Sequence, residues 1–274
     1  MPKPFKGGVD KLFKRGIGPL VSIIIATRKR VPQLLEAVDS CWGLAVDKSL
    51  LEFVFKVDDD DLDTIRAVER IATKTTCQMI ISPRERGYLS QGEWNNAMGE
   101  RAAGDWLFLF SDDARMVTQG WDQILLNTMD STWHGTGEML LLAPTLQRFD
   151  VDDLLLKIYA YEFPFLRRST FQALGHWGDP RWPYSDNWIW HVMNMVGSAM
   201  ISTIYIEHLQ NMDDEVRRES TTSIEDSGID WNHPEAVRGR IEDAGRLLDH
   251  IEAKMGKGND LMDNSYRKYR TLSN

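Results

Sequence analysis

The chain has 274 residues and a formal net charge of −9, with 42% hydrophobic and 27% charged residues. This length suffices for one large domain whose core needs no crosslinks, and the composition lies outside those of disordered or repetitive proteins. The negative charge disfavours a protein whose affinity rests on neutralising a nucleic-acid backbone. The longest apolar runs, at residues 21–26 and 139–143, are too short to cross a bilayer.

The N-terminal segment is basic but has neither the apolar stretch nor the cleavage site of a secretory signal. We therefore expect a cytoplasmic protein. Residues 1–19 are interpreted as a basic, solvated arm, with contact to nucleic acid or peripheral attachment to an anionic membrane surface as the alternative. Cys41 and Cys77 lack CxxC spacing and partner histidines, which indicates two reduced thiols and no metal site.

Short apolar runs alternate with helical patterns through the first half of the chain. Strands are predicted at residues 21–26, 51–57, 77–82 and 106–111, and helices at 32–42, 62–74 and 89–103. This alternation predicts an α/β fold with a mainly parallel central sheet and helices on both of its faces.

The second half is less regular. It carries predicted strands at 139–143 and 199–206 and a helix at 186–196. Residues 233–255 form an amphipathic helical pattern, which we expect to pack on the core or to join two copies of the chain in a homodimer.

The loop after the first strand, Thr27-Arg28-Lys29-Arg30, contains no glycine. A Rossmann dinucleotide site and a P-loop both need glycines there, because backbone N–H groups must approach the phosphates closely. Both classes are therefore excluded. A divalent metal held by carboxylates is the standard alternative for binding phosphate.

Carboxylates follow two of the predicted strands, and ligands of open α/β sheets bind at such strand ends. Asp58 and Asp59 end the second strand and are predicted to bind a ligand, whereas Asp61 or Asp63 is expected to cap the next helix. The adjacent pair Asp112 and Asp113 follows the fourth strand, where a metal or ribose site competes with a capping or turn role.

Three runs carry a family resemblance: VSIIIATRKRVPQLLEAVDSC, FKVDDDDLDT and EWNNAMGERAAGDWLFLFSDDARMVTQGWDQIL. Their order resembles the inverting family-two glycosyltransferases of the GT-A fold, over roughly residues 20–210. The resemblance implies a catalytic domain at 20–210, divided into a nucleotide-binding half (20–115) and an acceptor half (116–210). A C-terminal helical extension would occupy 211–274.

The resemblance also assigns roles on the donor side. Asp113 would hold Mn or Mg, and His208 would complete the metal shell, with a merely structural histidine as the alternative. The implied donor contacts are Thr27, Asp58 or Asp59, Asp112, and Arg86 or Arg84. The chain departs from the family pattern where Asp60 and Asp61 replace the usual Gly and Ser, and where Ala114 replaces a third acidic residue.

On the acceptor side, Asp186 falls where the family places its general base. Its alternative role is capping the helix that contains Trp188, and Asp179 is the reserve candidate for the base. The tryptophans Trp177, Trp182, Trp188 and Trp190 gather in this half, either as sugar platforms or as core.

The predicted activity is thus a metal-dependent, hexosyltransferase-like transfer from a nucleotide-diphosphate sugar, foremost a UDP-sugar, to a hydroxyl group with inversion. The acceptor is left open among glycans, lipid-linked sugars, proteins, small molecules and modified nucleic-acid bases. A catalytically silent nucleotide-sugar-binding or scaffold domain is the alternative. Metal-dependent nucleotidyl transfer is disfavoured because the glycine loop is missing.

Overall fold

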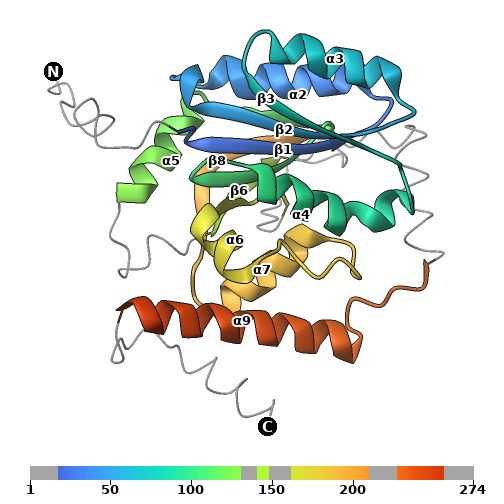
Figure 1. Ribbon diagram of the computed structural model, residues 1–274. Coiled ribbons are helices and arrows are strands. Elements are labelled where there is room, and N and C mark those ends of the chain that lie inside the picture. Colours follow the sequence, from blue (N-terminus) through green and yellow to red (C-terminus); the bar gives the residue numbers. More distant parts are fainter. Residues whose placement is uncertain (1–17, 131–140, 148–161, 210–226, 256–274) are drawn as a thin grey trace, which may run out of the picture.

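A computed structural model describes residues 18–130, 141–147, 162–209 and 227–255. Within them one sheet has the strand order β3-β2-β1-β4-β7-β6-β8-β5 (Figure 1). The strands are β1 (Val21–Thr27), β2 (Leu51–Asp58), β3 (Thr76–Ser82), β4 (Trp106–Ser111), β5 (Ala114–Met116), β6 (Leu141–Gln147), β7 (Phe165–Arg167) and β8 (Ala199–His208). Most of the predicted basic arm, as well as residues 210–226 and 256–274, lies outside the described residues.

The first four strands of the order, β3, β2, β1 and β4, run parallel, as the β-α alternation predicts. Beyond β4 the sheet is mixed, because β7 pairs antiparallel with both β4 and β6 while β6 and β8 run parallel. The parallel register places Thr27 beside Val57, and Ala26 beside Ser111. The carboxyl ends of β1, β2 and β4 therefore meet at one edge of the sheet.

Helices α2 (Val31–Leu44), α3 (Leu62–Ala72) and α5 (Trp121–Asp130) accompany one face of the sheet. Alternation along β1 sends Ile23 and Ile25 into the core on this face, where they join Leu34 of α2 and Trp121 of α5. Ile24, between them, belongs to the core on the opposite face.

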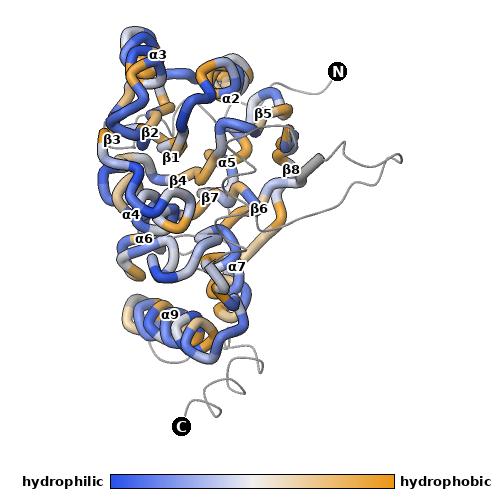
Figure 2. Tube along the Cα trace, turned by 90° about the vertical axis from the view of Figure 1, so that its right-hand side faces the viewer, coloured by the Kyte–Doolittle hydropathy of each residue, from blue (hydrophilic) through white to orange (hydrophobic). Residues whose placement is uncertain are grey.

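The opposite face is covered by α4 (Gln91–Arg101), α6 (Arg168–Leu174) and α7 (Ser185–Met195), with α9 (Pro234–Met255) as an outer layer (Figures 1 and 2). Along α9, Ala236, Ala244 and Leu247 are buried in the core shared with α6 and α7. In the described parts the amphipathic face of α9 thus packs on this chain's own core.

The predicted strands and helices of the first half are confirmed, and each of their ends agrees to within two residues. The sequence interpretation missed β5, β7, α5 and α6, which are short or carry weak periodicity. Trp177 and Trp188 are buried in the core, so the core interpretation is right for these two, while Trp182 and Trp190 are only partly buried.

Both cysteines are free, with Cys41 buried and Cys77 partly exposed. Across the described segments, no helix has the length and apolar character that crossing a membrane requires.

Candidate functional site

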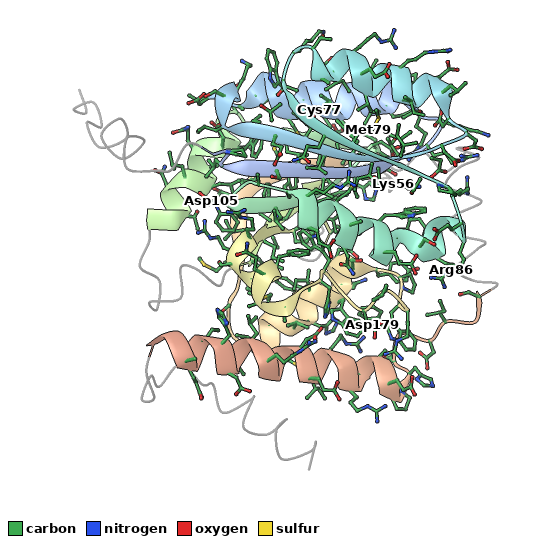
Figure 3. The ribbon with its side chains drawn as sticks, viewed as in Figure 1. Lys56, Cys77, Met79, Arg86, Asp105 and Asp179 are labelled. Atoms are coloured by element: carbon green, nitrogen blue, oxygen red, sulfur yellow. The ribbon has the colours of Figure 1, made fainter. Side chains whose placement is uncertain are left out.

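The polar side chains that follow β1, β2 and β4 gather at the edge where the carboxyl ends of these strands meet. Figure 3 shows Lys56, near the end of β2, on the right, and Asp105, just before β4, on the left. The candidate site lies on the right-hand side of this view. This placement agrees with the general rule for ligand sites in open α/β sheets.

Asp112 joins β4 to the loop after β1. Its two carboxylate oxygens accept from the Thr27 hydroxyl at 2.7 Å and from the Arg30 guanidinium at 2.6 Å. All three side chains are buried, and the same Arg30 nitrogen lies 3.6 Å from Asp113. Burial raises the pKa of Asp112, and the adjacent Asp113 charge adds to this, while Arg30 opposes it. The structure thus brings the predicted donor residues Thr27 and Asp112 into direct contact.

Asp58 is buried and surrounded by cations. One oxygen pairs with the Lys56 ammonium and the other accepts from Arg28 at 2.8 Å. Asp59 and Asp60 are exposed, and Asp60 also pairs with Arg28. Both oxygens of Asp58 therefore have protein partners, whereas Asp59 is open to solvent.

The acidic run also begins α3. Asp61 is the N-cap residue, and its side chain accepts from the backbone N–H of Thr64 at 3.2 Å. A capping role in this run is therefore confirmed, and it falls on Asp61, while the Asp63 side chain is 86% exposed.

Asp113 faces His208, which ends β8. The Asp113 Oδ1 and His208 Nε2 atoms are 3.5 Å apart, and the other ring nitrogen, Nδ1, lies 2.9 Å from Glu162 Oε2. Burial lowers the pKa of His208, but the two flanking carboxylates outweigh it and raise the pKa to about 8. Burial likewise opposes ionisation of Asp113, yet His208 and the Ser111 hydroxyl hold its pKa well below the usual range.

The residues at this point fit a divalent cation. A carboxylate kept ionised and an imidazole are suitable oxygen and nitrogen ligands, and the two carboxylates favour positive charge between them. Among the described residues no group of three or more His, Cys, Asp or Glu side chains forms a metal cluster. Asp113 and His208 would therefore supply two ligands of such a site.

Asp186 lies in the first turn of α7, and Tyr184, with φ 68°, is the N-cap residue of that helix. The Asp186 Oδ1 accepts from the backbone N–H of Asn187 at 2.9 Å. Asp186 thus satisfies one N–H group at the start of the helix without being the N-cap residue. Burial raises its pKa to about 6, and the Glu162 charge adds to the rise.

The charges of both Asp186 and Asp113 act on the phenol of Tyr88. Burial raises the pKa of Tyr88, and the negative charges of Asp186 and Asp113 add to this. Both carboxylates are therefore within electrostatic reach of one side chain.

Asp179 and Arg86 lie lower on the same side of the molecule in Figure 3. Asp179 is engaged by Arg181, whose Nε lies 3.0 Å from a carboxylate oxygen, so this carboxylate already has a cationic partner. Arg86 forms an exposed ion pair with Glu93 of α4 at 2.9 Å.

Sequence reasoning did not select five residues that the structure places at this edge. They are Arg28, Arg30, Lys56, Tyr88 and Glu162. The basic run after β1 offered one clue, because three cations beside two acidic strand ends imply ion pairing. Glu162 and Tyr88 carried no comparable pattern.

No protein-family model matches the chain, and no curated protein matches its sequence. Solved structures do match. Residues 1–349 of S. aureus TarS superpose with a TM-score of 0.56 at 13% identity, covering 85% of this chain and 72% of that one. The same TarS segment in complex with UDP-GlcNAc gives 0.53 at 11% identity, with the same coverage.

A mannosyltransferase, PcManGT from Pyrobaculum calidifontis in complex with GDP-Man and Mn2+, gives a TM-score of 0.57 at 13% identity. This match covers 96% of the present chain and 84% of the mannosyltransferase chain. Identities this low establish the fold alone. The chain shares the fold of these sugar-nucleotide-binding proteins, which confirms the predicted GT-A fold.

Proposed function

We propose that the chain is a metal-dependent glycosyltransferase that transfers a sugar from a nucleotide-diphosphate sugar, foremost a UDP-sugar, to an acceptor hydroxyl with inversion. The observation that carries the proposal is the pairing of Asp113 with His208, 3.5 Å apart, at the carboxyl edge of the sheet. Structures of this fold bind UDP-GlcNAc, and GDP-Man together with Mn2+, which supports the same ligand classes here.

Thr27, Asp58, Asp59 and Asp112 are proposed to bind the nucleotide. Asp113 and His208 would hold Mn or Mg, which stabilises the charge that develops on the leaving diphosphate. Arg86, which forms an exposed ion pair with Glu93, is proposed as a further donor contact.

Asp186 is the proposed general base. Its carboxylate accepts from the Asn187 backbone N–H, whereas Asp179 is already paired with Arg181. The pKa of Asp186, about 6, suits a base that must be ionised near neutrality. The carboxylate would take the proton of the acceptor hydroxyl as that oxygen bonds to the anomeric carbon, while the bond to the nucleotide diphosphate breaks and the diphosphate leaves with the electron pair.

The alternative of a silent binding domain rests on Ala114, where the resembling family has a third carboxylate. In this structure Ala114 is 1% exposed, lies on β5 opposite His208, and packs in the core beside α2 and α5. Because this side chain is buried in the core, we propose that it takes no part in the metal site, and that Asp113 and His208 suffice without a third carboxylate.

The test is hydrolysis and transfer of a panel of nucleotide sugars, each assayed with Mn, with Mg and with a chelator. We expect turnover only with a divalent cation, and we expect Asp113→Ala to lose this cation-dependent turnover. Asp39→Ala, an exposed position on α2, is the matched control. Turnover that is indifferent to chelation, or a wild-type Mn response in Asp113→Ala, would refute the metal assignment.

Thermal unfolding in the presence of each nucleotide sugar ranks the donors, since a ligand at about 100 times its Kd stabilises the fold by roughly 2.7 kcal/mol. A silent binding domain would show such stabilisation with no hydrolysis under any metal condition.

A further inference from the structure

We propose that Glu162 is a positioning residue that fixes the imidazole of His208 so that Nε2 faces Asp113 and the cation. This inference rests on the proposed metal site and adds a residue that contacts His208 at its other ring nitrogen. Glu162 contacts Nδ1 of His208 while Asp113 lies at Nε2, so the effect proposed for Glu162 passes through the imidazole ring.

The geometry sets the orientation of the ring. Glu162 Oε2 is 2.9 Å from His208 Nδ1, and Nε2 of the same ring points toward Asp113 at 3.5 Å. A carboxylate can only accept, so Nδ1 carries the hydrogen, and in the neutral imidazole the lone pair lies on Nε2. A carboxylate behind a ligating histidine raises its basicity and holds its tautomer.

The surroundings keep both partners in place. The His208 side chain and the Glu162 side chain are each 13% exposed, so little water competes for their hydrogen bond. The ring of Phe163 lies edge-on to the His208 ring, with centroids 5.0 Å apart and planes at 77°. The imidazole is thus held from its Nδ1 side and against one aromatic neighbour.

The backbone beside Glu162 is itself unusual. Phe163 has φ 57°, a left-handed conformation that is rare for a bulky residue. Its ring is buried and also packs against Phe110, centroid to centroid 5.7 Å. The contacts of this ring with Phe110 and His208 hold the residue that follows Glu162, and such strain persists where the surrounding structure imposes it.

The decisive measurement is the affinity for Mn2+ alone, read from the electron paramagnetic resonance signal of free Mn2+ without donor. We expect Glu162→Ala to weaken Mn2+ binding about 10- to 100-fold, as removal of outer-shell partners does elsewhere. Glu162→Gln, which keeps an oxygen able to accept from Nδ1, should lose less of the Mn2+ affinity. Glu207→Gln is the matched control, because this neighbouring carboxylate pairs with Arg115.

A second readout uses the metal-free protein. Nitrogen chemical shifts of the His208 ring, recorded at a pH where the ring is neutral, report which nitrogen carries the hydrogen. We expect the hydrogen on Nδ1 in the wild type and a mixture of tautomers in Glu162→Ala. A hydrogen on Nε2 in the wild type would overturn the inference, even if Glu162→Ala failed to fold.

The controls separate this inference from the proposed function. If Asp113→Ala loses Mn2+ while Glu162→Ala binds it with wild-type affinity, the role of Glu162 is refuted and the metal site stands. If Asp113→Ala also binds Mn2+ as the wild type does, the metal site itself is refuted and the inference falls with it.

Discussion

Lys56 and Asp58 form a buried ion pair on β2, two residues apart and on the same face of the strand. Their side chains are 2% and 3% exposed, and the Lys56 ammonium also lies 4.0 Å from the centroid of the Trp94 ring. A lysine this deep in a sheet is tolerated only with such partners.

The pair makes Asp58 a stability residue, whatever its role in donor binding. We expect Asp58→Ala to lower the free energy of unfolding by about 3–5 kcal/mol, because it leaves the Lys56 charge buried without its closest anion. Asp59→Ala, at the exposed neighbouring position, should change it by less than about 0.5 kcal/mol. Urea unfolding of both variants checks this, and equal midpoints would contradict it.

Asp186→Asn separates transfer from donor binding. The amide keeps the size of the side chain and an oxygen for the Asn187 N–H, but it cannot take a proton. We expect donor affinity to survive and transfer to fall about 10²- to 10⁴-fold. Transfer assays are paired with melting curves of Asp186→Asn and Asp186→Ala. Near-normal transfer in a folded Asp186→Asn protein would contradict this assignment. The general base would then be Asp179, or the reaction would use no such base.

The pH dependence of transfer should report the same carboxylate. Burial and the Glu162 charge raise the pKa of Asp186 to about 6, so the base is ionised above this value and protonated below it. At saturating donor, acceptor and metal, kcat should fall about tenfold per unit below roughly pH 6. A rate that stays flat between about pH 5 and 7 would contradict the assignment.

Gly104, just before β4, allows the chain to pass against β1. A Cβ built there would lie 2.5 Å from the Ser22 backbone nitrogen, while one at Gly43 would meet nothing within 4 Å. We expect Gly104→Ala to destabilise the fold by about 1–3 kcal/mol. Gly43→Ala, inside α2, should stabilise it by up to about 1 kcal/mol. Thermal unfolding compares them, and equal shifts would refute the close approach.

The first half of the fold could be predicted from the sequence because its signals are local. Runs such as residues 21–26 and 51–57 are continuously apolar or β-branched, and they alternate with helical periods long enough to recognise. The strands β5 and β7 have three residues each, which is too short to show any period. Their place in the sheet depends on partners far along the chain.

The residues of the candidate site also fall into two groups, those that the sequence pattern indicates and those that only spatial contacts identify. Asp58, Asp112 and Asp113 stand out because each follows an apolar run, which is a property of the sequence. Glu162 could not be found, since its relevance comes from contact with His208, 46 residues later. Lys56 was hidden because a single cation inside a strand pattern normally indicates a solvent-facing position.

The late position of β7 in the chain bears on how the protein is made. β4 has the sequence Trp-Leu-Phe-Leu-Phe-Ser, and its second edge is covered by β7 through the pairs of Trp106 with Arg167 and Phe108 with Phe165. During synthesis more than 50 residues separate the emergence of these two strands. A nascent or truncated chain that ends before Phe165 thus carries an open aromatic edge, which is a template for association with other chains.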